Sequence, residues 1–340
     1  MDNLKPFTTS ELNLILNKRP KETKLGEHIV VLPDANGIYE QLLKLDVTYV
    51  IFGIKEDIGV FANCGKTGTS NAWDATIKIL LNTQSNAHTH AKQIAILGSL
   101  EFPKYQNQLS QLNPTKTSAI KKARKKVAKI DESVSHLVSQ IVSAGKIPII
   151  IGGGHNNAYG NLKGTALGLK QPINAINFDA HHDFRAEEGR HSGNGFSYAY
   201  TEGFLKSYFI FGLHENYTSE KVFQTLKKLK NIQYNTFESM MIRQEYSFEN
   251  EMDIALDHIS SRYFGLEIDC DAIQDIPSSA MTPSGFSVNK ARTFVNYFGK
   301  QKKVSYLHIC EASPTPSTEI QIGKLITYLI TDFIRAHENN

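Results

Sequence analysis

Short apolar runs alternate with longer helical patterns along most of this chain, and this alternation constrains the fold more than any other feature. The apolar runs have the length of buried strands, and we expect strands at residues 49–54, 94–98, 147–151, 173–178, 208–212, 263–268 and 304–309. The helical patterns lie at 71–82, 117–144, 156–168, 217–230, 247–260, 288–299 and 317–336. Such alternation predicts an α/β protein with a mostly parallel sheet and helices on both faces.

The chain has 340 residues, and its apolar fraction of 41% is ordinary for a globular protein and allows a sizeable core. Neither an internal repeat nor a linker rich in proline, glycine or serine divides it. We therefore predict one domain over residues 1–340, with a peripheral N-terminal segment at 1–45 and a peripheral loop at 83–92.

The charge and the cysteines indicate an ordinary intracellular protein. The formal net charge of +3 is small and argues for no particular partner. The three cysteines are widely spaced and do not form a disulfide framework, which favours the reducing cytoplasm. No apolar run approaches the ~20 residues of a membrane span, and the N-terminus lacks the apolar core of a signal peptide. We expect a cytoplasmic protein without a membrane partner.

Potential metal ligands follow three of the predicted strands. Segment 179–183 reads Asp-Ala-His-His-Asp, segment 269–271 reads Asp-Cys-Asp, and His155 follows a turn of three glycines. In an open parallel sheet, ligands bind beyond the carboxyl ends of the strands, where all three groups would lie. One aspartate after a strand is more often a turn or cap residue, but the joint placement of these groups has no simple structural explanation.

The spacing within the two acidic segments also favours a metal site. Alternate side chains of an extended segment point the same way, so Asp179, His181 and Asp183 can face one site, as can Asp269 and Asp271. Four aspartates balance the charge of two divalent cations, whereas without metal they would repel one another and raise their own pKa values. Ligation rich in carboxylates and without thiolate suits Mn²⁺ better than a structural Zn²⁺.

At these residues the chain resembles the ureohydrolase (arginase–agmatinase) superfamily. The matching segments are Gly152-Gly153-Gly154-His155, Asp179-Ala180-His181-His182-Asp183, Asp269-Cys270-Asp271 and Glu311-Ala312-Ser313-Pro314. The resemblance implies a three-layer α/β/α sandwich, two Mn²⁺ per subunit, a homo-oligomer, and hydrolysis of a guanidinium or amidine C–N bond. By motif position, the metal ligands would be His155, Asp179, His181, Asp183, Asp269 and Asp271.

Within the superfamily the chain is most similar to the formimidoylglutamase branch. Arg185 after the motif, Ser192 before a glycine, and Gly154 all resemble that branch. The implied reaction converts N-formimidoyl-L-glutamate and water to L-glutamate and formamide, a step of histidine degradation. The chain differs from the usual family pattern at Asn156, Glu267 and Ser313, and these changes leave the six ligand positions unaltered.

The implied mechanism assigns roles to further residues. A hydroxide shared by two metals would attack the amidine carbon, while Asp183 accepts its proton and passes it to the leaving nitrogen. Glu311 would bond the cationic amidinium, unless it caps the helix that starts near residue 317. Arg185 would bind a substrate carboxylate, or else form a surface salt bridge. Ser192 and Asn194 could add hydrogen bonds to the substrate.

Several alternative functions stay open at this point. One is an arginase, agmatinase or other guanidino-acid hydrolase that releases urea, and another is a related one-metal zinc deacetylase. A third is a metal-binding protein without catalysis. The basic run at 121–129 could contact nucleic acid, but its apolar spacing favours a solvated helix face, so we expect no nucleic-acid partner. We assign no role to His191 or His214.

Overall fold

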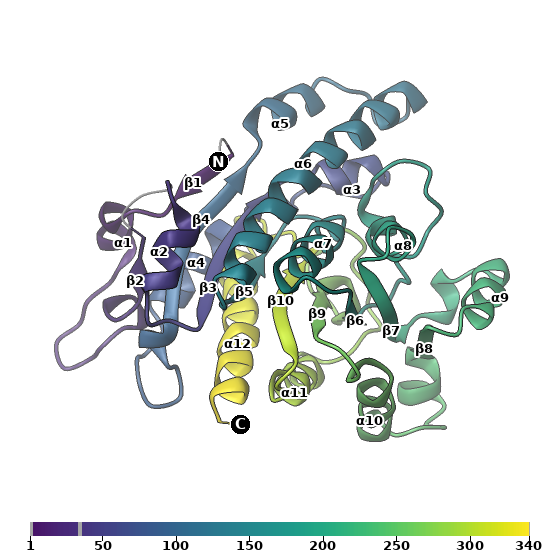
Figure 1. Ribbon diagram of the computed structural model, residues 1–340. Coiled ribbons are helices and arrows are strands. Elements are labelled where there is room, and N and C mark those ends of the chain that lie inside the picture. Colours follow the sequence, from purple (N-terminus) through teal and green to yellow (C-terminus); the bar gives the residue numbers. More distant parts are fainter. Residues whose placement is uncertain (1–2, 33–35, 340) are drawn as a thin grey trace.

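The computed structural model describes residues 3–32 and 36–339. Within them, ten strands form one sheet, in the order β1-β4-β3-β5-β10-β9-β6-β7-β8, with β2 also paired to β4 (Figure 1). The strands are β1 (Leu4–Pro6), β2 (Val30–Val31), β3 (Tyr49–Lys55), β4 (Ile94–Glu101), β5 (Ile147–Ile151), β6 (Ile173–Phe178), β7 (Leu205–Leu213), β8 (Ile232–Thr236), β9 (Phe264–Asp269) and β10 (Val304–Cys310). The pairing of β1 with β4 is antiparallel, and the pairings from β4 to β8 are parallel.

Helices cover both faces of the sheet and complete three layers. They are α1 (Thr9–Ile15), α2 (Ile38–Lys44), α3 (Ile58–Ala62), α4 (Ala72–Leu81), α5 (Pro103–Leu109), α6 (Thr117–Ser143), α7 (Asn157–Leu169), α8 (Gly195–Thr201), α9 (Glu220–Lys228), α10 (Phe248–Ile259), α11 (Val288–Gly299) and α12 (Glu319–Glu338). Helices α4, α10, α11 and α12 bury their apolar sides on one face, and α2, α6, α7 and α8 on the other. The predicted fold class is thereby confirmed.

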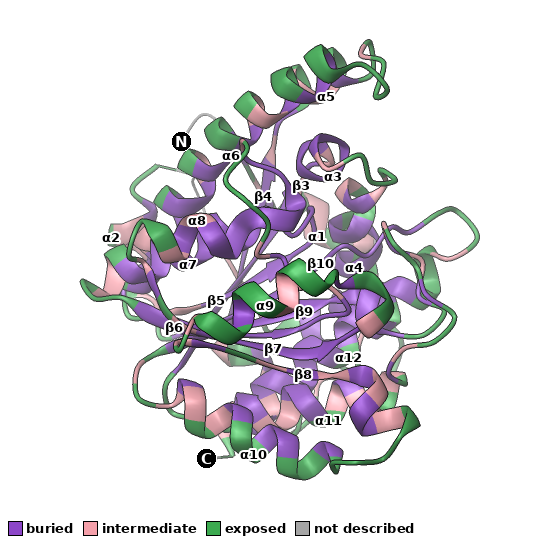
Figure 2. Ribbon diagram, turned by 90° about the vertical axis from the view of Figure 1, so that its right-hand side faces the viewer, coloured by how far each residue is buried: buried purple, intermediate pink, exposed green. Residues whose placement is uncertain are grey.

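The central strands are buried along nearly their whole length and are mostly apolar, because helices cover both of their faces. In β3, Tyr49 and Ile51 join one core cluster, while Val50 and Phe52 join the other. Figure 2 shows the central strands almost entirely buried, with most exposed residues on the outer sides of the helices and in the loops. This burial on both faces is the physical origin of the short apolar runs in the sequence.

The seven predicted strands and seven predicted helices are present, with ends that differ by a few residues. Strands β1, β2 and β8 and several short helices were not predicted from the sequence. The segment at 1–45 contributes β1 and β2 to the sheet, where both pair with β4. Strand β8 lies at the opposite edge and is only half buried, so its sequence lacks the apolar run of a central strand.

Helix α7 is held close to α6 by a stripe of glycines, and this contact positions the site. A Cβ on Gly160 would lie 2.7 Å from the Val134 Cβ, and one on Gly164 would lie 2.7 Å from the Val138 Cβ. Because α7 begins two residues after His155, the close packing of α7 on α6 sets where the preceding glycine turn and His155 lie.

Candidate metal centre

The predicted ligands gather at the carboxyl ends of neighbouring strands. Strands β5, β10, β9 and β6 are adjacent in the sheet. His155 follows β5, Asp269 ends β9, and Asp179 directly follows β6. Segments far apart in the sequence therefore meet at one edge, as the crossover topology predicts.

His155 lies at the centre of the cluster and is fully buried. Its Nδ1 atom is 2.8 Å from Asp183 Oδ2, 3.0 Å from Asp269 Oδ2 and 3.3 Å from Asp179 Oδ2. Neither ring nitrogen makes a hydrogen bond with suitable geometry to any described residue. Because buried polar atoms are normally paired, an orphaned imidazole facing three carboxylates fits a metal ligand.

His181 forms the second half of the cluster with Asp271. Its Nδ1 atom is 3.5 Å from Asp179 Oδ1 and 3.8 Å from Asp271 Oδ2. Asp179 thus faces one histidine with each of its carboxylate oxygens. Backbone N–H groups fix the carboxylates: His181 donates to Asp179 Oδ1 and Asp271 donates to Asp269 Oδ1, both at 2.7 Å. The six residues predicted as ligands therefore lie together in one site.

The electrostatics of the cluster favour the binding of additional positive charge. Burial and the charge of Asp179 raise the pKa of Asp183, and burial together with Asp271 raises the pKa of Asp269. Burial lowers the pKa of His181, but Asp179 outweighs it and brings that pKa to about 10. Without metal, the cluster holds protons between its carboxylates and imidazoles, and divalent cations can replace those protons. A set of two imidazoles and four carboxylates without thiolate suits Mn²⁺.

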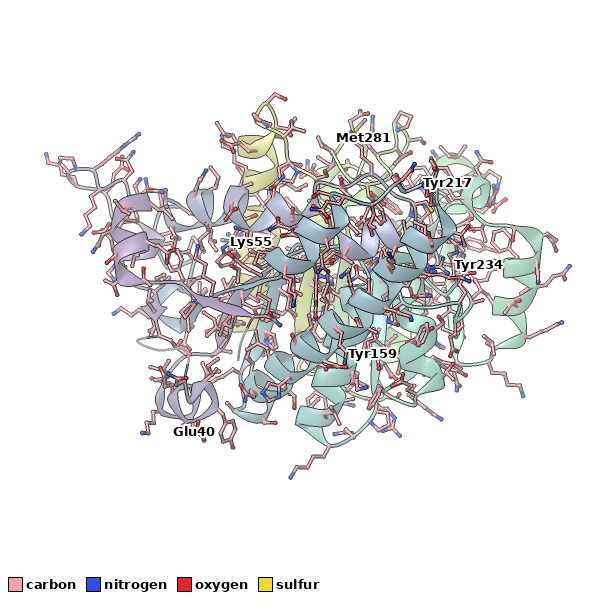
Figure 3. All side chains as sticks on the ribbon, turned by 90° about the horizontal axis from the view of Figure 1, so that it is seen from above. Glu40, Lys55, Tyr159, Tyr217, Tyr234 and Met281 are labelled. Atoms are coloured by element: carbon pink, nitrogen blue, oxygen red, sulfur yellow. The ribbon has the colours of Figure 1, made fainter. Side chains whose placement is uncertain are left out.

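A pocket of about 910 Å³ opens above the cluster. Its floor includes His181, Asp183, Asp269, Asp271 and Glu311, and its walls include Arg185, Ser192, Tyr217 and Lys221. Tyr217, labelled in Figure 3, comes from the segment between β7 and α9, and its ring is stacked on that of His181 at a centroid distance of 5.4 Å. The pocket gives a small polar molecule access to the cluster.

Glu311 follows β10 and points one oxygen into the site. Its Oε1 atom accepts a hydrogen bond from the His155 backbone N–H at 2.7 Å, and its Oε2 atom has no hydrogen-bond partner among the described residues. Burial and the charge of Asp271 raise the pKa of Glu311 to about 8. The alternative role as a helix cap is wrong, because α12 begins at Glu319 with Thr318 as its N-cap.

Two of the acidic residues adopt a strained backbone. Glu311 has φ +60° and Asp183 has φ +42°, in the left-handed region that residues other than glycine rarely adopt. Such strain costs of order 1–3 kcal/mol and is typical of functional sites. In both cases it accompanies a carboxylate that lies on the pocket floor.

The three predicted substrate contacts occupy different positions. Arg185 is half exposed on the pocket wall, and its Nη1 atom donates to Asn63 Oδ1 at 2.7 Å. Ser192 lines the same wall and accepts a hydrogen bond from Asn63 Nδ2 at 3.0 Å. The predicted substrate contact of Asn194 is wrong, because this residue is fully buried and does not line the pocket. Its Oδ1 atom accepts hydrogen bonds from Arg190 and from the His191 N–H, and its Nδ2 atom donates to the Gly189 carbonyl oxygen.

Glu56, which fixes the glycine turn through hydrogen bonds, was not predicted from the sequence. This fully buried carboxylate accepts hydrogen bonds from the backbone of Ile58, Gly59 and Gly154, and from Asn157 Nδ2 at 2.8 Å. Its position just after a predicted strand, at the same sheet edge as the ligands, was the available signal. Of the two histidines without an assigned role, His214 stacks on Tyr217, and His191 caps its own loop through Gly193.

The chain is similar in sequence to known proteins over most of its length. A model of the arginase family matches residues 47–334. A formimidoylglutamase of Streptococcus gordonii is 26% identical over 309 residues, or 86% of each chain. A formimidoylglutamase of Streptococcus pyogenes is 24% identical over 279 residues, which are 78% of this chain and 77% of that protein.

Solved structures share the fold. The formimidoylglutamase of Bacillus subtilis aligns with a TM-score of 0.74 and 17% identity over 95% of each chain. A Trypanosoma cruzi formiminoglutamase crystallised with Mn²⁺ aligns with a TM-score of 0.72 and 18% identity, over 93% of this chain and 98% of that one. No helix in the described part of the chain has both the length and the apolar character that crossing a membrane requires.

Proposed function

From the premise that the chain belongs to the arginase family, we propose that it converts N-formimidoyl-L-glutamate and water to L-glutamate and formamide. As a member of this family it is a hydrolase of C–N bonds in linear amidines. The convergence of two histidines and four aspartates in one cluster carries the proposal, because His181, Asp183, Asp269 and Asp271 of that cluster also line one pocket. The formimidoylglutamases among its relatives support the choice of substrate.

We assign the binding of two Mn²⁺ ions to the six residues of the cluster. His155 and Asp183 would serve one half, His181 and Asp271 the other, and Asp179 and Asp269 lie between the halves. Bound there, two divalent cations would lower the pKa of a water molecule and make it a nucleophile near neutral pH.

Asp183 is placed to move the proton in the reaction. Its carboxylate lies both at the cluster and on the pocket floor, 2.8 Å from the His155 ring. When water adds to the planar amidine carbon, Asp183 can accept a proton from it. The same proton then passes to the leaving nitrogen, so that the C–N bond of the tetrahedral carbon breaks and the amino group of glutamate departs neutral.

Glu311 and Arg185 would bind opposite ends of the substrate. The free Oε2 atom of Glu311 can accept a charge-assisted hydrogen bond from the amidinium N–H groups. Arg185, braced by Asn63, presents a planar guanidinium that can hold a carboxylate through two hydrogen bonds. Lys221 adds a second cation to the same pocket, and Ser192 a hydroxyl. A substrate with a cationic amidine at one end and two carboxylates at the other matches this distribution of charge.

A direct assay separates the candidate functions. The Mn²⁺-loaded protein is given formimidoylglutamate, arginine, agmatine and guanidinobutyrate, and both formamide and urea are measured. We expect formamide from the first substrate alone. Urea from any of the others would favour the guanidino-acid hydrolases, and Mn²⁺ binding without turnover of all four would favour a non-catalytic protein. The single domain, the homo-oligomer and the cytoplasmic location stay predictions.

A further inference from the structure

A buried carboxylate that the reaction does not use lies directly behind His155. Glu267 is on β9, two residues before Asp269, and is fully buried. Its Oε1 atom accepts a hydrogen bond from the Tyr306 hydroxyl at 2.7 Å, and its Oε2 atom is 2.5 Å from His308 Nδ1. Both partners are on the neighbouring strand β10. Two hydrogen bonds therefore hold this carboxylate in a single orientation.

The same carboxylate faces the His155 ring on the side away from the aspartates. Glu267 Oε2 lies 3.5 Å from His155 Nε2, whereas the three aspartate oxygens surround Nδ1. Nε2 of His155 makes no hydrogen bond of its own within the described residues. No other acidic side chain of the described chain is paired with that nitrogen. Cys310 lies in the same group of buried side chains, but a thiol is a weak acceptor, so Glu267 is the group toward which an Nε2–H would be directed.

We propose that Glu267 is a positioning residue that accepts the Nε2–H of His155 and so keeps the Nδ1 lone pair directed at the metal centre. A neutral imidazole carries one proton, so a proton held at Nε2 leaves Nδ1 free as a ligand. Histidine ligands commonly donate their other ring N–H to a carboxylate, which orients the ring and makes it a stronger ligand. The inference rests on the proposed metal centre and adds a residue outside the six ligands.

The supports of Glu267 favour this role over a general structural one. The His308 ring lies between Glu267 and the turn that precedes His155, since its Nδ1 atom is 2.5 Å from Glu267 Oε2 and its Nε2 atom is 3.3 Å from the Gly152 carbonyl oxygen. The network of Tyr306, His308 and Glu267 therefore connects β9, β10 and the turn bearing His155. A carboxylate needed only for folding would affect the metal-free protein, whereas a positioning residue affects metal affinity.

The test measures Mn²⁺ binding to the purified chain, by calorimetry and by metal analysis of the protein after gel filtration. Glu267→Gln keeps the size of the side chain but removes the charge that accepts the His155 N–H. We expect Mn²⁺ affinity to fall roughly 10- to 100-fold, the usual effect of losing such a partner, with the loss concentrated in one of the two equivalents.

Two further variants make the result specific. Glu251→Gln is the matched control, because Glu251 is also a buried carboxylate that accepts an amide hydrogen bond, from Asn235 Nδ2 at 2.9 Å, but lies outside the metal centre. It should bind two Mn²⁺ with the affinity of the unaltered chain. Tyr306→Phe removes one support of Glu267 and should weaken binding by a smaller factor, which keeps the test decisive if Glu267→Gln does not fold.

The outcomes distinguish this inference from the proposed function. Two Mn²⁺ bound with unchanged affinity by both Glu267→Gln and Tyr306→Phe would overturn the positioning role and leave the hydrolase proposal intact. An equal loss of affinity in Glu251→Gln would also overturn it, because the effect would then be general destabilisation. If the unaltered chain binds no Mn²⁺, both proposals fail.

Discussion

Asp179 is the residue on which the two halves of the candidate centre depend. It is fully buried, and its two oxygens face different histidines. Asn177 Nδ2 donates to Oδ2 at 2.8 Å and the His181 N–H donates to Oδ1, so the carboxylate cannot rotate freely. Burial would raise the pKa of Asp179, but the interactions with His155 and His181 outweigh it and lower that pKa, whereas the pKa values of its aspartate neighbours are raised.

Asp179→Asn is expected to abolish tight binding of both Mn²⁺ ions, because an amide is a poor substitute for a carboxylate shared by two sites. The loss of affinity should exceed ~100-fold, since changes at residues that only support a ligand already cost about 10–100-fold. Metal analysis after gel filtration measures it. The exposed Asp46→Asn should retain two ions, and retention of two ions by Asp179→Asn would remove this residue from the ligand set.

Arg185 provides a residue-scale test of the substrate. Removing a charged hydrogen-bond donor costs about 1.5–3 kcal/mol, so Arg185→Ala should raise KM for formimidoylglutamate roughly 10- to 150-fold. Arg185→Lys should recover part of that loss, because it restores the charge without the planar guanidinium. Steady-state kinetics checks both. Lys122→Ala removes a cation from the exposed side of α6 and should change nothing; an unchanged KM in Arg185→Ala would show that the carboxylate is bound elsewhere.

At the scale of elements, the contact between α6 and α7 carries the turn that presents His155. The glycine stripe of α7 brings its backbone against valines of α6, and Glu56 ties the turn to the end of β3. The N-terminal residues of α7 and the preceding glycines thus form a rigid support beneath the centre. Rigid support matters because ligand geometry has to be set before the metal binds.

Gly164→Ala tests this packing. Its Cβ would lie 2.6 Å from the Ser135 carbonyl oxygen and 2.7 Å from the Val138 Cβ. Alanine gains about 1 kcal/mol in helix propensity, but overpacking of a tight contact typically costs about 1–3 kcal/mol. We therefore expect a net loss of unfolding free energy in urea denaturation of the metal-free protein. The exposed Leu167→Ala on the same helix is the control and should be near neutral; a stabilised Gly164→Ala would contradict the close contact.

For the whole molecule, the cluster makes stability depend on pH and on metal together. The pKa values of Asp183, Asp269 and Asp271 are raised above their ordinary values, chiefly by burial. Burial lowers the pKa of His181, but the interactions with Asp179 outweigh burial and raise the His181 pKa to about 10. A group whose pKa is raised by folding contributes stability that is lost as the pH rises through its folded pKa. Because the His181 pKa of about 10 lies above pH 7, the stability that this group contributes is lost as the pH rises above neutrality.

We expect the metal-free protein to lose stability between pH 7 and pH 8.5, while the Mn²⁺-loaded protein loses less. His182 and His191, whose pKa values burial lowers to about 4 and about 3, are neutral in the folded state and mostly neutral in the unfolded state across this range, so they offset little of the loss. Because the metal replaces protons, its stabilising effect should grow with pH. Thermal melts with and without saturating Mn²⁺ measure it; a Tm increase that is smaller at pH 8.5 than at pH 7 would contradict this interpretation.

Much of the fold could be predicted because its central strands are covered on both faces. Strand β5 is apolar throughout, β6 is apolar except for two asparagines, and α6 repeats its buried residues at helical spacing. Edge elements carry weaker signals: β8 is half buried, and β2 has only two residues. Of the site, the motif segments indicated the candidate ligands, whereas the internal use of the Asn194 amide by its own loop could not be foreseen.

The local sequence by itself determined which strand ends carry carboxylates and imidazoles. Buried strands, the turn glycines and the spacing of the ligand residues can each be recognised from a few consecutive residues. Only the tertiary structure decided that β5, β10, β9 and β6 lie side by side, and hence that Glu267, Tyr306 and His308 stand behind His155. Strand order depends on packing between residues far apart in the sequence, and no local spacing records it.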